Sequence, residues 1–163
     1  MNKAVQYIYI TKSANETHKL GYAIGRILEG GDVLSFWGGL GVGKTCMIQG
    51  IARGLDVPEN VYIKSPTFVI LNQYKGKVPV YHFDFYRINS VCEAMDLGCE
   101  EYFFSRGVTL IEWSENIISL LPEEYIKINM AWVSNLERRI EILGIGSKKY
   151  RDRLALLKKF KNK

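Results

Sequence analysis

The stretch GGLGVGKT, at residues 38–45, constrains what this chain can fold into more than any other feature. It holds four glycines in eight residues, and glycine costs backbone entropy without adding a side chain to a core. It fits the pattern G-x-x-x-x-G-K-[ST] and lies between an apolar run at residues 32–37 and a segment of helical periodicity at residues 46–55. A glycine-rich turn from a strand into a helix can direct several backbone N–H groups inward. The pattern therefore predicts a loop that binds phosphate groups.

Each fixed position of this loop has a physical reason. We expect Lys44 to be a mobile, solvent-facing cation for the β- and γ-phosphate oxygens, and Thr45 to offer its hydroxyl to Mg²⁺, which prefers hard oxygen ligands. The helix that follows adds free N–H groups and a partial positive charge at its N-terminus. The sequence thus predicts a nucleoside triphosphate site with these contacts: Gly38, Gly39, Leu40, Gly41, Val42, Gly43, Lys44 and Thr45.

Two acidic residues directly follow apolar runs that are typical of strands. Asp84 follows residues 80–83, and Glu112 follows residues 108–111. A P-loop NTPase needs a carboxylate near its metal ion, and sequence spacing does not decide which of the two it is. From the residues alone we therefore predict that at least one of Asp84 and Glu112 acts with Lys44 in catalysis and faces the metal beside Thr45, which makes both acids candidates for the catalytic set and for the metal. The sequence has no Asn-Lys-x-Asp element of the kind that selects guanine, which favours ATP over GTP.

Composition limits the class of protein. The chain has 163 residues, of which 47% are apolar and 24% charged, as expected for one soluble domain. No apolar run approaches the roughly 20 residues that cross a bilayer, and the first residues do not form a secretory signal, so we expect a cytoplasmic protein without a membrane partner. Three cysteines and two histidines argue against a disulfide framework or a structural zinc site. We expect the cysteines to be buried and inert, and His82 to be packed or hydrogen-bonded rather than a metal ligand.

Hydrophobic periodicity predicts an α/β fold. We expect a single three-layer, P-loop NTPase-like domain over residues 1–146, with a mixed sheet that includes a β-hairpin. Helices are expected from Ser13, after the phosphate loop, and over residues 90–104 with a break near Gly98. The expected strands cover residues 5–10, 32–37, 68–74, 78–86, 107–113, 125–133 and 138–143; the hairpin joins the third and fourth, and the last two pair with each other. In the strand at 125–133, Trp132 is expected on the buried side.

The C-terminal segment, residues 147–163, differs from the rest in charge. It carries eight Lys or Arg and one Asp, whereas the residues before it carry two more acidic than basic side chains. Tyr150, Leu154 and Leu157 fall on one face of a predicted helix, so the simplest expectation is a basic amphipathic helix that docks on the domain. A second possibility is that its lysines contact tRNA phosphates or an acidic face of a partner protein.

Five segments together resemble a known family: GGLGVGKT, KSPTFVILNQY, VYHFDFYRI, EAMDLGCEEYF and VTLIEWSE. Their order and spacing are similar to those of the small bacterial P-loop ATPases of tRNA threonylcarbamoyladenosine biosynthesis, the TsaE family. The resemblance runs from about Tyr7 to Ile142. SPTF and HFDFYR are specific to the family, whereas the P-loop is shared with many others.

The resemblance implies roles for individual residues. Glu112 matches the metal-binding acid, and Asp84 matches an acid near the γ-phosphate that positions water. Thr67 lies where a switch-type threonine would sense the γ-phosphate, while Trp113 and Arg139 match positions near the nucleotide. The segment from Thr11 to Asn15 resembles the part that borders the adenine. The chain departs from the family pattern at Gly39, where an acid is usual, and at Cys46, where a second threonine is common; both departures leave the phosphate and metal contacts in place.

For function, the resemblance implies a protein that binds and slowly hydrolyses ATP with Mg²⁺. It would act on the threonylcarbamoyl-transferase subunits and would not be the transferase. Two other classes stay open, a small-molecule P-loop kinase and a nucleotide-gated interaction module. Such kinases usually carry an arginine-rich lid. Residues 87–138 contain only three arginines, which counts against the kinase class: Arg87, Arg106 and Arg138. Arg87 and Arg139 are candidates for an arginine finger, unless the partner supplies one.

Overall fold

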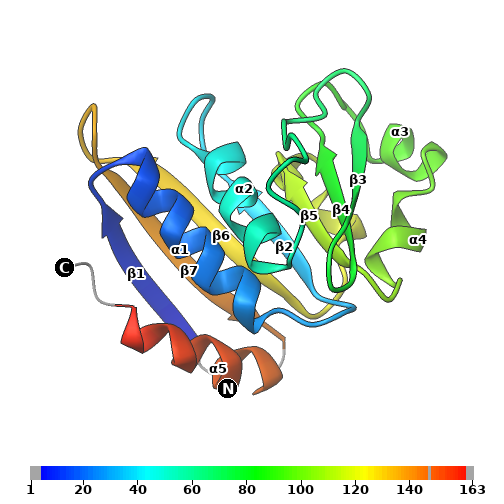
Figure 1. The fold of residues 1–163 in the computed structure, drawn as a ribbon. Coiled ribbons are helices and arrows are strands. Elements are labelled where there is room, and N and C mark those ends of the chain that lie inside the picture. The colour runs from blue at the N-terminus through cyan, green and yellow to red at the C-terminus, as the bar shows by residue number, and fades with distance from the viewer. Residues whose placement is uncertain (1–4, 147, 161–163) are drawn as a thin grey trace.

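A computed structural model describes residues 5–146 and 148–160, and these form one seven-stranded sheet in the order β1-β7-β6-β2-β5-β4-β3 (Figure 1). The strands β6, β2, β5 and β4 are mutually parallel, while β1, β7 and β6 pair antiparallel, as do β3 and β4. The expected mixed sheet, its β3–β4 hairpin and the pairing of β6 with β7 are therefore confirmed. The strands are β1 Val5–Thr11, β2 Val33–Trp37, β3 Leu71–Lys75, β4 Pro79–Asp84, β5 Val108–Glu112, β6 Tyr125–Trp132 and β7 Arg138–Ile145.

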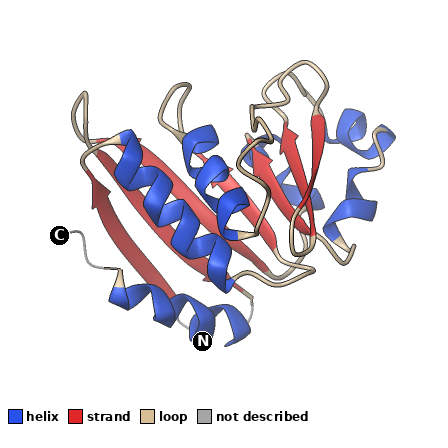
Figure 2. Cartoon of the chain, viewed as in Figure 1, coloured by secondary structure: helices blue, strands red, loops and turns tan. Residues whose placement is uncertain are grey.

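Helices cover both faces of this sheet and make the three layers (Figure 2). Neighbouring residues of a strand point to opposite faces, and in β2 Val33 belongs to one buried cluster and Leu34 to another. The cluster with Leu34 includes the apolar faces of α1 and α2, and the cluster with Val33 includes residues of α3, α4 and η1. The helices are α1 Ala14–Ile27, α2 Lys44–Gly54, α3 Val91–Asp96, α4 Cys99–Phe103 and α5 Lys148–Leu154, with 3₁₀ helices η1 Ser114–Leu120 and η2 Ala155–Lys159.

The helices α1 and α2 pack backbone against backbone, a contact that sequence analysis did not predict. A Cβ atom on Gly21 would overlap the carbonyl oxygen of Met47, and one on Gly50 would overlap that of His18. Ser13 caps α1 by accepting a hydrogen bond from the Glu16 N–H at 3.1 Å. Because α2 begins at Lys44, this close approach fixes the orientation of the helix that follows the glycine-rich loop.

The C-terminal helices α5 and η2 dock on the domain, as in the simpler expectation. Tyr150, Leu154 and Leu157 are buried in the same cluster as α1 and α2. Arg153 donates to both carboxylate oxygens of the buried Asp32, at 2.6 and 2.8 Å. The expected boundary between residues 1–146 and 147–163 stays a prediction, and Ser147 lies outside the described residues.

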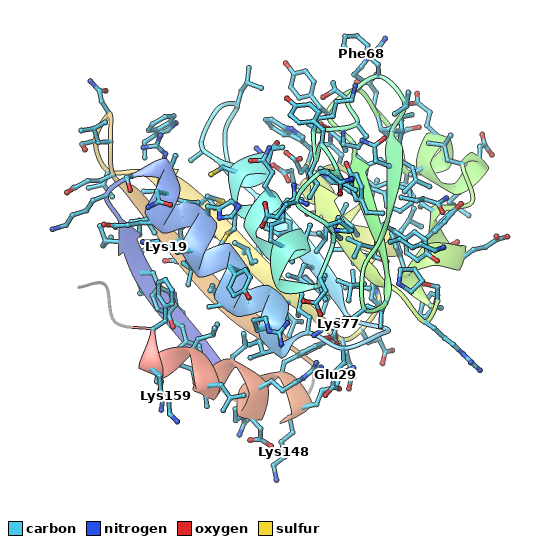
Figure 3. The ribbon with its side chains drawn as sticks, in the orientation of Figure 1. Lys19, Glu29, Phe68, Lys77, Lys148 and Lys159 are labelled. Atoms are coloured by element: carbon cyan, nitrogen blue, oxygen red, sulfur yellow. The ribbon has the colours of Figure 1, made fainter. Side chains whose placement is uncertain are left out.

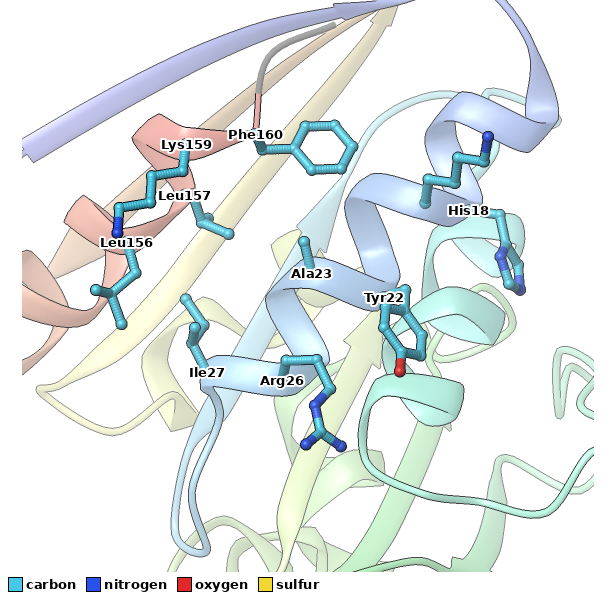
Figure 4. A pocket seen from close by; sticks show the side chains of 10 residues that line it. His18, Tyr22, Ala23, Arg26, Ile27, Leu156, Leu157, Lys159 and Phe160 are labelled. Atoms are coloured by element: carbon cyan, nitrogen blue, oxygen red, sulfur yellow. The ribbon is translucent and has the colours of Figure 1, made fainter.

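A groove separates the outer face of α1 from η2 (Figure 4). Its volume is about 610 Å³, and the apolar side chains in it include Ala23, Ile27, Leu157 and the ring of Phe160. The lining residues that carry a full charge are all basic: Lys19, Arg26 and Lys159. Among the described residues, no helix combines the length and apolar character needed to cross a membrane.

Three local expectations were wrong. Phe68–Ile70 do not join the hairpin strand, because the N–H groups of Val69 and Ile70 both bond to the carbonyl of Pro66 and close a turn. Trp132 is exposed because β6 ends there. Its ring stacks against the guanidinium of Arg138, whose Cζ lies 3.3 Å from the ring centroid. Cys92 is also exposed, because it lies on the outer side of the short helix α3.

Candidate nucleotide-binding site

The glycine-rich loop joins the end of β2 to the start of α2, as predicted. Two of its glycines require their conformation, since Gly38 has φ of 141° and Gly43, at the N-cap of α2, has φ of 110°. Residues with a Cβ atom rarely adopt such positive φ values. The N-cap side chain is a hydrogen atom, so it makes no cap bond, and the N–H groups of the first turn are left for an anion.

Lys44 is more buried than the sequence suggested. Lys44 is 4% exposed, and its ammonium group donates hydrogen bonds to the carbonyl oxygens of Gly38 at 2.6 Å and Gly39 at 3.0 Å. The same nitrogen lies 4.0 Å from the ring centroid of Trp113. Burial lowers the pKa of Lys44, and the negative charge of Glu112 partly opposes that shift. The lysine is thus held across the loop by two carbonyls, which an anion can replace, and is not solvent-facing.

Glu112 and Thr45 meet directly. The Thr45 hydroxyl donates to Glu112, lying 3.0 Å from Oε1 and 3.2 Å from Oε2. Glu112 ends β5 and is the register partner of Asp84, which ends β4, and of Phe36 near the end of β2. The carboxyl ends of these parallel strands therefore meet at one edge of the sheet, which brings both predicted acids to the loop.

Asp84 is buried and holds the loop after residue 64. Its Oδ2 accepts hydrogen bonds from the hydroxyls of Ser65 and Thr67, the latter at 2.9 Å. Its Oδ1 accepts from the backbone N–H of Tyr86 at 2.8 Å. Thr67 therefore lies in the site as the resemblance implied. Ser65 was not singled out from sequence, although it opens the segment SPTF that carries the family resemblance and Thr67.

Trp113 lies over the site because of its backbone. It follows Glu112 with φ of 58°, a left-handed conformation that is unusual for a bulky residue. This turn brings its ring over Lys44 and within 4.9 Å, between ring centroids, of Tyr86. A strained backbone of this kind persists only where the surrounding structure holds it in place. Here the strained conformation places the Trp113 ring over Lys44 of the phosphate loop.

The structure does not bring Arg139 to the loop. Its guanidinium pairs with Glu141 on one face of β7, whereas the Nε of Arg138, on the other face, donates to the Val42 carbonyl at 2.9 Å. Arg138 also lines a small cavity with Val42 and residues at the start of α1, where sequence similarity placed the adenine border. Neighbouring residues of β7 point to opposite faces, so the two arginines can be told apart once the register of the β6–β7 hairpin, with Trp132 opposite Arg138, is known.

His82, which we expected to be packed or hydrogen-bonded rather than a metal ligand, lies on β4 beside the site. It is completely buried, and its Nε2 lies 2.8 Å from Oε1 of Glu112. The expectation of a hydrogen-bonded histidine is confirmed, and the partner is a predicted site residue.

The donor set of the site fits Mg²⁺. Thr45, Glu112 and Asp84 offer hard oxygen atoms around a cavity of about 310 Å³, and residues 5–146 and 148–160 contain no cluster of three His, Cys, Asp or Glu that would hold a metal alone. Mg²⁺ usually takes one or two protein ligands and completes its shell with phosphate oxygens and water. The cavity is lined by Leu40, Gly41, Gly43, Lys44, Thr45, Cys46, Ser65, Thr67, Asp84, Tyr86, Glu112 and Trp113.

A mixed sheet with parallel central strands, a strand–glycine loop–helix turn and two acids at neighbouring strand ends define a P-loop NTPase-like protein. The family model for the threonylcarbamoyl adenosine biosynthesis protein TsaE matches residues 11–140. The chain belongs to the TsaE family, whose members take part in tRNA threonylcarbamoyladenosine biosynthesis.

Individual relatives agree with this assignment. The chain is 38% identical over 133 residues to the TsaE protein of Treponema pallidum (strain Nichols), covering 82% of this chain and 97% of the relative. It is 37% identical over 139 residues to TsaE of Bacillus subtilis (strain 168), covering 85% of each. A crystal structure of Bacillus subtilis YdiB matches with a TM-score of 0.81 and 31% identity, over 99% of this chain and 100% of that one.

Proposed function

We propose that this protein is a Mg²⁺-dependent ATPase required for the threonylcarbamoyladenosine modification of tRNA, and that it acts on the threonylcarbamoyl-transferase subunits in the cytoplasm rather than as the transferase. The convergence of Lys44, Thr45, Glu112 and Asp84 at one edge of the sheet carries the proposal. Its relatives named as tRNA threonylcarbamoyladenosine biosynthesis proteins supply the pathway.

The chemistry of phosphoryl transfer to water needs positioning and charge stabilisation more than covalent catalysis. In this proposal, the loop N–H groups and Lys44 bind the β- and γ-phosphates, and Lys44 exchanges its two carbonyl contacts for phosphate oxygens. Thr45 and Glu112 would hold Mg²⁺, which would neutralise charge on the phosphate oxygens. Asp84 orients the attacking water, and Thr67, which it already holds, senses the γ-phosphate.

The arginines support an ATPase that is weak alone. Arg139 is paired with Glu141, and Arg138 is bound to the loop backbone, so neither guanidinium is free to reach a γ-phosphate. Arg87, the other arginine-finger candidate, has its Cζ 5.3 Å from the ring centroid of Phe68. Phe68 is exposed and lies at the tip of the loop that Asp84 holds (Figure 3). An arginine supplied in trans raises such rates by about 10³–10⁵-fold. Stimulation by the transferase subunits follows from the proposal.

The direct test is ATP hydrolysis by the purified protein with and without the transferase subunits. We expect a low Mg²⁺-dependent rate that rises at least tenfold with the subunits, and that Glu112→Gln removes. A rate unchanged by the subunits would contradict the proposed partner. Transfer of labelled γ-phosphate to a metabolite without any partner would instead support the kinase class. Full tRNA modification by Glu112→Gln or Asp84→Asn proteins that still bind ATP would support a nucleotide-gated interaction module.

A further inference from the structure

His82 is the buried neighbour of Glu112, the acid that is proposed to face Mg²⁺. On β4, Val80, His82 and Asp84 share the face that packs toward α2, and Val80 belongs to the same buried cluster as α2. The register partner of His82 on β5 is Leu110, so Glu112 lies two residues further along the neighbouring strand. The imidazole reaches along the sheet to Glu112, with 2.8 Å between Nε2 and Oε1, and is 0% exposed.

The contact has a defined direction. An ionised carboxylate can only accept hydrogen bonds, so Nε2 is the donor. The Nδ1 atom is buried and has no hydrogen-bond partner within the described part of the chain. A hydrogen on Nε2 therefore satisfies the pair, whereas one on Nδ1 would be a buried donor without an acceptor, which costs free energy. The polar function of this buried ring is directed at one atom, the Oε1 of Glu112.

Glu112 has two side-chain partners in the described structure, Thr45 and His82. If Thr45 and Glu112 hold Mg²⁺ as proposed, the Thr45 hydroxyl would no longer donate to the carboxylate, and His82 would be the remaining side-chain contact that fixes Glu112. We propose that His82 is a positioning residue that keeps Glu112 aimed at the metal once Thr45 has released it. This inference rests on the proposed Mg²⁺-nucleotide site and adds a residue to it.

Four variants of the full chain test the proposal: His82→Leu, His82→Gln, His82→Asn and, as a control, Val80→Ala. Leucine removes the donor, glutamine can place an N–H near the position of Nε2, and asparagine is too short to do so. Val80→Ala makes a cavity on the same face of the same strand without touching Glu112. Binding of a fluorescent ADP analogue is titrated with Mg²⁺ and repeated in EDTA, and folding is checked by circular dichroism and thermal melting.

We expect His82→Leu to raise the Mg²⁺ concentration for half-maximal binding by about 10–100-fold, the usual cost of losing the partner of a metal-site carboxylate. Its affinity for the nucleotide in EDTA should stay within about twofold of the original protein. His82→Gln should recover most of the Mg²⁺ response and His82→Asn should not. Val80→Ala should lower the melting temperature and leave the Mg²⁺ response unchanged.

Wild-type Mg²⁺ dependence in folded His82→Leu would overturn the proposal. If that variant does not fold, equal Mg²⁺ responses of His82→Gln and His82→Asn would overturn it. A wild-type protein whose nucleotide binding ignores Mg²⁺ would instead refute the proposed metal site itself, and this inference with it.

Discussion

The nucleotide end of the sheet and the C-terminal helices both depend on positive charge, but they use it differently. At the nucleotide end, Lys44 is buried, crosses the loop to two backbone carbonyls and lies under Trp113. In the C-terminal segment, Arg153 forms an ion pair with Asp32, while Lys148 and Lys159 project from α5 and η2 (Figure 3). Burial and hydrogen-bond partners therefore decide what a cation can do: the one enclosed lysine lies in the candidate site, whereas the charge-rich C-terminal segment docks through its apolar face.

The largest effect is expected at the enclosed lysine. Lys44→Met keeps the length of the side chain and removes its charge, so turnover of ATP should fall by roughly 10²-fold or more. Because burial disfavours the charged form, the melting temperature should change little or rise. Steady-state hydrolysis and thermal melting check both parts. Turnover within a few-fold of wild type would refute the P-loop assignment.

The apolar face of the C-terminal helices should matter for stability and not for chemistry. Leu154 is completely buried between α5 and the domain, so Leu154→Ala should lower the free energy of unfolding by about 2–5 kcal/mol. Hydrolysis per folded molecule should be unchanged at a temperature well below the melting point. Denaturant unfolding gives the first value and an active-site titration the second. A large loss of turnover in the folded protein would remove the contrast between the two regions.

The exposed charges of the same helices should have a smaller, salt-dependent effect. Lys158 and Lys159 are exposed at the end of η2, with Lys159 on the groove beside α1. If they contact tRNA phosphates, the variant Lys158→Ser with Lys159→Ser should reduce the slope of log affinity against log salt by about 1.5. Equal slopes would leave these lysines without a role in RNA binding. Weaker binding of the transferase subunits with equal RNA slopes would point to an acidic protein surface.

The smallest effect is expected at Gly39. Its φ lies outside the left-handed region, and a Cβ atom there would meet nothing within 4 Å. Gly39→Asp, which introduces the acid that the resemblance led us to expect at this position, should therefore change the free energy of unfolding by less than about 0.5 kcal/mol. Thermal melting tests this tolerance, and turnover shows whether the added carboxylate alters Lys44. A destabilisation above 2 kcal/mol would mean that the loop is more constrained than its open surroundings indicate.

Local patterns in the sequence predicted the elements well and the side-chain partners less well. The strand–loop–helix turn at residues 32–55 depends on glycine positions and periodicity, which act over a few residues. We expected Arg139 beside the nucleotide loop, but Arg138 lies there. The difference reflects strand alternation, because a shift of one residue along a strand moves a side chain to the other face of the sheet. The bond from His82 to Glu112 and the contact of Gly21 with α2 join distant segments, so they depend on strand register and helix packing that one sequence does not display.

In the proposed mechanism Thr45 and Glu112 would separate to admit one Mg²⁺ ion while His82 holds the carboxylate. A crystal structure with Mg²⁺ and a non-hydrolysable ATP analogue tests it most directly. We predict that both Thr45 and Glu112 lie in the first or second shell of the ion, that their direct hydrogen bond is lost, and that the His82–Glu112 bond remains. An ion held by Asp84 alone, with Glu112 still bonded to Thr45, would refute the proposed metal site and exchange the roles of the two acids.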